Sequence, residues 1–273
     1  MPAPSIARQS AGMHSFKDEV VWITGASAGI GAALAHEFSN RGAIVCLSAR
    51  RRERLEELAK AISESGGRAF AYPCDVTVEE DVAETVRAIV EAHGKLDCAV
   101  ANAGFGVSGR IESLSADDWR RQFDVNVVGA AITAKYALSE LRQSHGRLVL
   151  VGSIMSMMSS AKAGAYSASK YAVRSIGQTL SLELHGSGAT CTTIHPGYVS
   201  TEIALVDNDG VFHEDREDRR PAKLMWPADK AAKVMVNAIA RRKREFVFTG
   251  HGKLGGYLGR HFPGFVHFAQ TRR

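Results

Sequence analysis

The sequence predicts an α/β protein built as one doubly wound domain, in which helices flank both faces of a seven-stranded, mostly parallel sheet. Three observations support this prediction. Short apolar runs alternate with stretches of helical periodicity along most of the 273 residues. The apolar runs lack a polar face, as expected for strands that are covered on both sides. A hydrophobic content of 45% suffices for one large core, and no repeat or low-complexity linker divides the chain.

The expected strands are short, mostly apolar and bounded by turn residues, which distinguishes them from helices. They cover residues 20–24, 43–48, 68–73, 97–102, 147–153, 190–196 and 245–250. Between them, apolar residues recur at helical spacing, which predicts crossover helices. The recurring residues are Leu55, Leu58 and Ile62, then Val82, Val86 and Val90, then Val173, Ile176, Leu180 and Leu184. Right-handed crossovers between parallel strands then restrict the topology.

Three segments fall outside this alternation. We expect residues 1–14 to be a flexible leader, because the first 12 lack the apolar core of a signal peptide. The main domain is expected over 15–250. Within it, residues 202–226 form a long polar stretch that we interpret as a substrate lid. A basic and aromatic tail follows at 251–273.

Charge and cysteine content exclude several classes of function. The net charge of +5 comes from residues 241–273, which hold eight Lys or Arg and one acid. No basic stripe with interleaved aromatics marks a nucleic-acid face. No apolar run is long enough to span a membrane. The four cysteines are widely spaced, which favours buried free thiols in a reducing cytoplasm and predicts no metal site.

The first expected strand runs directly into a glycine-rich turn, TGASAGIG at 24–31. A dinucleotide pyrophosphate needs bare backbone and free N–H groups where a strand turns into a helix. Gly25, Gly29 and Gly31 provide this pattern, although their spacing differs from the commoner G-x-G-x-x-G. The sequence therefore predicts a dinucleotide-binding, Rossmann-type fold.

The end of the second strand indicates which nucleotide binds. A carboxylate there would bind a ribose 2′-hydroxyl, and an arginine suits a 2′-phosphate. Ser48 and Ala49 stand where the acid is expected, and Arg50, Arg51 and Arg52 follow. NADP(H) is therefore favoured over NAD(H), which remains possible, and Arg50 is the first candidate for the phosphate contact.

Tyr166 and Lys170 stand four residues apart, so they share one face of a helix. Tyrosine ordinarily keeps its proton to about pH 10. A neighbouring ammonium favours the phenolate, so we expect Lys170 to lower the pKa of Tyr166. Ser153, at the carboxyl end of the fifth strand, can hold a substrate oxygen beside that phenol. This arrangement suits proton transfer during carbonyl reduction.

Seven motifs occur in order and together are similar to the classical short-chain dehydrogenase/reductase family over about residues 16–250. They are TGASAGIG (24–31), CDVT (74–77), ANAG (101–104), VNVVG (125–129), Ser153, YSASK (166–170) and PGYVST (196–201). One departure is Ala101, where many members have a second Asn.

The resemblance implies a catalytic set of Asn126, Ser153, Tyr166 and Lys170, in which Asn126 helps to position a water next to Lys170. It also implies that Lys170 bonds the nicotinamide ribose and that Asp75 contacts the adenine. The expected cofactor-binding residues are Gly25, Ser27, Ala28, Gly29, Ile30, Gly31, Arg50, Asp75, Val76, Asn102, Ala103, Gly104, Tyr166, Lys170, Pro196, Gly197, Val199 and Thr201. His195 has no family role, and we interpret it as structural.

The predicted function is an NADP(H)-dependent oxidoreductase that interconverts a small-molecule carbonyl and an alcohol. Apolar residues of the lid and after Ser153 suggest a bulky apolar substrate. They are Val199, Ile203, Leu205, Val206, Leu224, Met225 and Trp226, with Met155, Met157 and Met158. These side chains could equally pack against one another.

Two alternative functions remain open. One is an NAD-dependent alcohol dehydrogenase of the same fold, and the other is a catalytically silent dinucleotide-binding sensor or scaffold. The resemblance implies a homodimer or homotetramer. The tail could lie on a membrane, but docking on protein is favoured, because Pro263 and the glycines interrupt a continuous amphipathic helix.

Overall fold

The computed structural model describes residues 15–218 and 220–272, so the leader expected over 1–14 lies outside them. Seven strands form one sheet in the order β3-β2-β1-β4-β5-β6-β7, and every pairing between them is parallel. This confirms the predicted fold class. The strands are β1 Val20–Thr24, β2 Ile44–Ser48, β3 Arg68–Ala71, β4 Cys98–Ala101, β5 Arg147–Val151, β6 Thr190–His195 and β7 Glu245–Val247.

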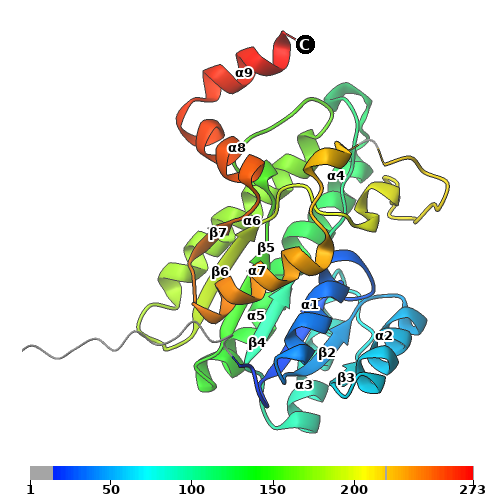
Figure 1. Cartoon of the computed structure of the whole chain (residues 1–273), viewed down its shortest axis with the longest axis vertical. Coiled ribbons are helices and arrows are strands. Elements are labelled where there is room, and N and C mark those ends of the chain that lie inside the picture. The colour runs from blue at the N-terminus through cyan, green and yellow to red at the C-terminus, as the bar shows by residue number, and fades with distance from the viewer. Residues whose placement is uncertain (1–14, 219, 273) are drawn as a thin grey trace, which may run out of the picture.

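The strand order creates the place for a ligand. The chain builds outward from β1 to β2 and β3, then returns to β4 on the other side of β1. The connections after β1 and β4 therefore leave the sheet in opposite directions and open a crevice at its carboxyl edge. Figure 1 shows the strands in the middle of the molecule, with helices on both faces.

The described residues form nine α-helices, of which six cover the two faces of the sheet. The nine helices are α1 Gly29–Asn40, α2 Arg52–Glu64, α3 Glu79–His93, α4 Ala116–Phe123, α5 Gly129–Gln143, α6 Gly164–Glu183, α7 Ala228–Ala240, α8 Gly250–His261 and α9 Pro263–Thr271. Within β1, Val21 and Ile23 join the core beneath α1, α2 and α7, whereas Val20 and Trp22 join the core beneath α3, α5 and α6. All four side chains are fully buried, as predicted for strands without a polar face.

The structure adds regular elements where the sequence suggested irregular ones. The tail folds as two short helices, and Pro263 opens the second, where its missing N–H costs nothing. Among the described residues of the stretch 202–226, in contrast, the regular elements are two 3₁₀ turns, Glu202–Leu205 and Ala222–Leu224, and an isolated antiparallel bridge between Val206 and Phe212. A bridge between Val199 and Trp226 closes its base.

All four cysteines are buried and free. No helix among the described residues has the length and apolar character needed to cross a bilayer. No cluster of His, Cys, Asp and Glu among them could hold a metal ion.

Candidate active site

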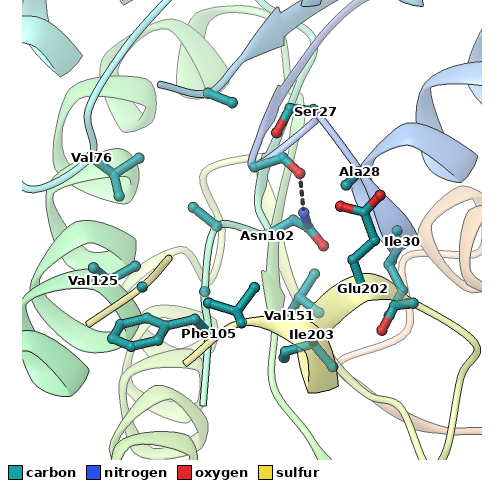
Figure 2. Close-up of a pocket in the computed structure, with 18 of the residues that line it drawn as sticks. Ser27, Ala28, Ile30, Val76, Asn102, Phe105, Val125, Val151, Glu202 and Ile203 are labelled. Atoms are coloured by element: carbon teal, nitrogen blue, oxygen red, sulfur yellow. Dashed lines mark hydrogen bonds between the residues drawn. The ribbon is translucent and has the colours of Figure 1, made fainter. Parts of the chain in front are cut away.

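The glycine turn between β1 and α1 packs too tightly for side chains. Gly25 and Gly29 have positive φ values of 65° and 57°, which L-residues with a Cβ rarely adopt. A Cβ on Gly31 would collide with the carbonyl oxygen of Gly25. Asn102, from the loop after β4, holds the turn, because its Nδ2 donates to the carbonyl oxygens of Thr24 (3.0 Å) and Gly25 (3.1 Å). Figure 2 shows one of these bonds in the cavity wall.

A cavity of about 540 Å³ opens beside this turn. It is lined by 17 of the 20 predicted site residues, which come from the loops after β1, β2, β3, β4 and β6, from the start of α1 and from α6. The exceptions are Gly31, Asn126 and Ser153, which do not line it. The cavity therefore gathers at one edge the residues that the sequence motifs singled out separately.

Asp75 and Val76 line the cavity from the loop after β3. The Asp75 carboxylate accepts hydrogen bonds from the backbone N–H (2.9 Å) and hydroxyl (2.8 Å) of Thr77, which forms a local turn. Val76 packs against Gly129 at the start of α5, where a Cβ would come within 2.8 Å of its side chain. Both residues are thus held in place by local contacts.

Arginines concentrate at the end of the cavity next to β2. Arg51 donates to the Ser27 hydroxyl in the glycine turn at 2.9 Å, and Arg54 binds the Glu202 carboxylate at 3.0 Å. Burial and the neighbouring charge of Arg54 lower the pKa of Arg51. Arg50 lines the same cavity with an exposed side chain. The sequence favoured Arg50, but Arg51 is the arginine fixed to the turn.

Ser48, at the position where an acid was expected, has a structural role. It is buried, accepts a hydrogen bond from the indole N–H of Trp22 (2.9 Å), and donates one to the carbonyl oxygen of Tyr72 (2.6 Å). No carboxylate of β2 therefore competes with an anion near Arg51.

Tyr166 and Lys170 lie one turn apart near the start of α6 and face the same cavity, as predicted. The Lys170 Nζ lies 5.8 Å from the centroid of the Tyr166 ring. It donates a hydrogen bond to the carbonyl oxygen of Val151, the last residue of β5, at 2.9 Å. Burial lowers the pKa of Lys170 to about 8.

The expected lowering of the Tyr166 pKa by Lys170 was wrong for the free protein. Burial raises the pKa of Tyr166 above its ordinary value, and a hydrogen bond with Ser153 and the charge of Arg220 only partly oppose this. The physical reason is that Lys170 is itself desolvated and directs its ammonium at Val151. The cation that acts on the phenol comes from Arg220, which the sequence did not single out.

Ser153 follows β5 and caps the 3₁₀ turn Ile154–Ser156, and its hydroxyl accepts a hydrogen bond from the Met155 N–H at 3.2 Å. Beneath it lies His195, the fully buried last residue of β6. The His195 Nδ1 lies 3.2 Å from the Ser153 carbonyl oxygen and 2.8 Å from the Ser156 hydroxyl. The buried imidazole of His195 therefore holds the turn that carries Ser153 through these two contacts.

On its other side, the His195 Nε2 lies 3.0 Å from a carboxylate oxygen of Glu245 in β7. Although burial would raise the pKa of Glu245, hydrogen bonds with His195, Arg174 and Arg260 hold it well below its ordinary range. This cluster connects the Ser153 turn to α6 and α8.

Asn126 lies in a π-helical segment, Asp124–Val128, between α4 and α5. Its amide exchanges two hydrogen bonds with the backbone of Phe105, both at 3.1 Å, and donates to the Ser169 hydroxyl at 3.1 Å. A Cβ on Gly104 would lie 2.9 Å from the Asn126 Oδ1 and 3.5 Å from the Lys170 Nζ. Asn126 thus stands next to Lys170 and joins the β4 loop to α6.

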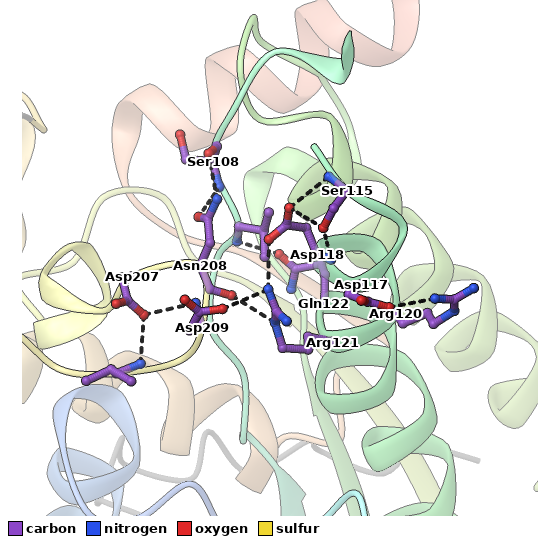
Figure 3. A network of polar contacts seen from close by, with 12 residues as sticks. Ser108, Ser115, Asp117, Asp118, Arg120, Arg121, Gln122, Asp207, Asn208 and Asp209 are labelled. Carbon is purple, nitrogen blue, oxygen red and sulfur yellow. Dashed lines mark hydrogen bonds and ion pairs between the residues drawn. The ribbon is translucent and has the colours of Figure 1, made fainter. Parts of the chain in front are cut away.

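Residues 202–226, the predicted lid, line one side of the cavity and also contact α4. Arg121 of α4 binds the Asp209 carboxylate at 2.9 Å, and its Nε donates to the carbonyl oxygen of Asn208 at 3.2 Å. The Asn208 amide makes two further bonds with the backbone of Ser108, at 3.0 and 3.1 Å. Figure 3 shows this network between the tip of the lid and α4.

At the other end of the lid, Arg220 donates to the carbonyl oxygens of Val199 (3.1 Å) and Thr201 (2.9 Å) and pairs with Asp218. Arg121, Glu202 and Arg220 are thus lid contacts that sequence analysis missed. The charge-rich composition of residues 202–226 was the sequence signal for Glu202 and Arg220, and nothing marked Arg121 in α4.

Only part of the predicted apolar substrate surface faces the cavity. Val199, Ile203 and Val206 line it, together with Phe105 and other apolar residues that were not predicted. The prediction was wrong for Met157 and Met158, because they pack against the glycines of α8. Neither these methionines nor Met155, Leu205, Leu224, Met225 and Trp226 line the cavity.

A parallel doubly wound sheet with a glycine turn, a Ser153–Tyr166–Lys170 group and a cavity between them defines a dinucleotide-dependent type of site. Residues 19–210 match the family model described as short chain dehydrogenase, so the chain belongs to the short-chain dehydrogenase/reductase family. This confirms the resemblance found in the sequence.

Relatives and solved structures agree with the family. An uncharacterized oxidoreductase of Staphylococcus aureus strain USA300 is 36% identical over 235 residues, which cover 84% of this chain and 99% of that protein. A short-chain dehydrogenase/reductase of Burkholderia phymatum in complex with NAD superposes with a TM-score of 0.82 at 26% identity, covering 93% of this chain and 97% of that one. An alcohol dehydrogenase of Thermococcus sibiricus complexed with 5-hydroxy-NADP gives a TM-score of 0.73 at 27% identity, covering 84% and 95%.

Proposed function

We propose that this protein is an NADP(H)-dependent oxidoreductase that interconverts a ketone or aldehyde and an alcohol, with Tyr166 as the general acid and base. The observation that carries the proposal is the convergence of Tyr166, Lys170 and Ser153 beside the glycine turn at the carboxyl edge of the sheet. A dinucleotide fits this cavity, because the turn offers bare backbone at Gly25 and Gly31, where side chains would collide.

Each residue has a distinct part in this mechanism. When bound, the nicotinamide supplies or accepts the hydride. Tyr166 donates its phenolic proton to the developing alkoxide oxygen in reduction and accepts it back in oxidation. Ser153 holds the same oxygen by a hydrogen bond and orients the phenol. Lys170 supplies positive charge beside Tyr166 and a donor for the cofactor ribose, and Asn126 fixes the loop that flanks it.

The preference for NADP(H) rests on the arginines after β2. Arg51 is held on the glycine turn by Ser27, and β2 ends in a buried serine instead of a carboxylate. The positive field of Arg50, Arg51 and Arg54 is partly balanced by Glu202. A 2′-phosphate would bind in that field, whereas a free 2′-hydroxyl would find no acid to accept its hydrogen bond.

The substrate is proposed to be a bulky apolar carbonyl compound. Ile203 and Phe105 line the cavity from the lid and the β4 loop (Figure 2), and Val206 also lines it. The lid closes this side through Arg121 and Asn208. Small polar ketones would leave this apolar surface in contact with water, so their turnover should be slower.

The test uses purified protein, NADPH or NADH, and a panel of ketones and aldehydes from small polar to bulky apolar. Tyr166→Phe should abolish turnover while NADPH still binds. The control is Tyr171→Phe, on the exposed side of the same helix, which should leave both properties intact. Wild-type protein that binds NADPH but reduces nothing, or a Tyr166→Phe variant with full turnover, would refute the proposed mechanism.

A second pair of variants tests the cofactor preference. Arg51→Asp should weaken NADPH binding on the order of tenfold to a hundredfold, because a charge-assisted hydrogen bond is lost and a repulsion is added. NADH binding should change little. Arg52→Asp is the matched control, since its side chain is 63% exposed and pairs only weakly with Glu56. Equal losses of NADPH and NADH affinity in Arg51→Asp would argue against a 2′-phosphate contact.

A further inference from the structure

Helix α8 attaches to the protein through a face made of glycine. Gly255, Gly256 and Gly259 lie against Met157 and Met158, and a Cβ on Gly256 would come within 2.9 Å of the Met157 sulfur. Gly252 is buried on the same side. Such close packing fixes the rotation of the helix about its own axis. The opposite side of α8 is therefore held away from the domain.

That opposite side is apolar. At 100° per residue, Leu254, Tyr257, Leu258 and His261 fall on the face opposite the glycines. The side chains of Leu254 and Tyr257 are 61% and 57% exposed. The Tyr257 ring packs against His261 at 4.8 Å, so the face is preorganised as one patch.

Helix α9 continues this exposed surface. None of its described residues is buried, and its link to the domain includes a hydrogen bond from the Gln270 amide to the Ser159 carbonyl oxygen. At 100° per residue, Phe265 and Phe268 fall on the side of α9 away from Gln270. Both are about half exposed, and Arg272 stacks on the Phe268 ring at 4.2 Å. Phe262, at the break between the helices, is also exposed. Figure 1 shows both helices projecting from one end of the molecule.

The segment that contains α8 and α9 carries positive charge without any acidic residue. Residues 246–273 contain four Lys or Arg, three His and no acid. Among the described cations, Arg260 is paired with Glu245, whereas Lys253 and Arg272 are exposed and Arg272 stacks on Phe268. An acid-free surface that mixes exposed aromatic rings with cations is complementary to the interface of an anionic bilayer, where rings insert at headgroup level and cations meet lipid phosphates.

We propose that α8 and α9 form a docking surface for an anionic lipid bilayer. Continuity of the helix is unnecessary, because each short helix presents its own exposed aromatic face and glycine packing aligns α8 with the domain. Helix α8 packs on the turn after Ser153, so docking would bring the carboxyl edge of the sheet toward the lipid.

Sedimentation with vesicles tests this proposal on the full chain. Vesicles of phosphatidylcholine alone are compared with an equimolar mixture of phosphatidylcholine and phosphatidylglycerol, at low and high salt. We expect binding to the anionic vesicles that weakens with salt and is much poorer on neutral vesicles. A protein that stays in the supernatant with anionic vesicles overturns the proposal.

Two double variants separate the apolar and charged contributions. Phe265→Ser with Phe268→Ser, and Lys253→Glu with Arg272→Glu, should each reduce the vesicle-bound fraction roughly tenfold or more. Each variant is first checked for unchanged NADPH binding and thermal unfolding, which shows that the domain is folded.

The controls change similar residues elsewhere on the surface. Leu182→Ser on α6 is 75% exposed, and Lys60→Glu on α2 is also exposed. Neither should affect vesicle binding. If instead the phenylalanine variant converts a larger oligomer into a smaller one while wild-type protein ignores vesicles, the surface is a subunit contact and the proposal is wrong.

Discussion

Lys170 is expected to lower the stability of the free protein. Its ammonium is buried, and burial brings its pKa from an ordinary 10.5 to about 8. The interval between these two pKa values corresponds to about 3 kcal/mol by which the charged form disfavours folding at neutral pH. Lys170→Met removes the charge but also the hydrogen bond to Val151, which contributes about 1 kcal/mol. The variant without cofactor should therefore be about 2 kcal/mol more stable at pH 7.

The stability difference between wild type and Lys170→Met should depend on pH in one direction. Between pH 8 and 10.5 the unfolded chain holds a proton on Lys170 that the folded chain has released, so the Lys170 penalty fades as the pH rises. The buried thiols act oppositely, because burial raises the pKa of Cys74 to about 11 and of Cys98 and Cys191 to about 12. The contribution of Lys170 is therefore measured as the difference in the free energy of unfolding between wild type and Lys170→Met, in which the effect of the thiols cancels.

Denaturant unfolding of both proteins without cofactor, from pH 7 to 10, measures this difference. In a separate thermal unfolding experiment at pH 7, the melting temperature of the variant should be higher by roughly 5 °C. Lys60→Met, an exposed change on α2, should shift stability by less than about 0.5 kcal/mol. A Lys170→Met protein that is less stable at pH 7, or a stability gain that is the same at pH 7 and pH 10, would refute the reasoning.

Three further substitutions test other parts of the structure. Gly31→Ala should weaken NADPH binding more than tenfold and cost about 2 kcal/mol, because its Cβ collides with the turn, whereas Gly264→Ala meets nothing within 4 Å and should be neutral in both assays. Glu245→Gln should lower the free energy of unfolding by about 2 kcal/mol at pH 7, since the partly buried Arg174 and Arg260 lose the carboxylate that pairs with them. That loss should shrink as the pH falls below 4.5, because wild-type Glu245 then becomes protonated on unfolding; a constant loss would contradict the ion-pair role. Leu148→Ala in β5 should cost about 3 kcal/mol in the same unfolding assay, against almost nothing for exposed Leu254→Ala.

The sheet could be predicted because the composition of each strand and the alternation of strands and helices along the chain indicate the same fold. Each strand is a short apolar run between turn residues, and β1 runs straight into its glycine turn. The parallel topology followed from that alternation, and seven parallel strands were found. Residues that line the cavity from loops after different strands could be named because each motif sits at a strand end, where parallel strands converge.

Contacts across the sequence were harder to predict. The bonds of Arg121 with Asp209 and Asn208 join residues almost 90 positions apart, and nothing local in α4 marks its partner in the lid. The methionines after Ser153 were misplaced for a similar reason. Their apolar character fits a substrate pocket and a helix contact equally well, and the glycines of α8 decided between the two.

Burial also determines pKa directions that spacing alone cannot give. Four-residue spacing placed Lys170 beside Tyr166 correctly, yet the desolvation of both groups depends on how the lid and loops cover them. A sequence shows that two groups are neighbours. It does not show how much water each of them keeps, so the predicted lowering of the tyrosine pKa failed.

In the free protein, burial pushes both groups of α6 toward their neutral forms, because it raises the pKa of Tyr166 and lowers that of Lys170. A proton donor that works near neutral pH needs more positive potential than this pair supplies. Arg220 adds some, and it is held at the cavity by the carbonyl oxygens of Val199 and Thr201. Since Arg220 belongs to the lid, the acidity of Tyr166 depends on the position of the lid. The loop 202–226 therefore makes Tyr166 a stronger acid than burial alone would allow.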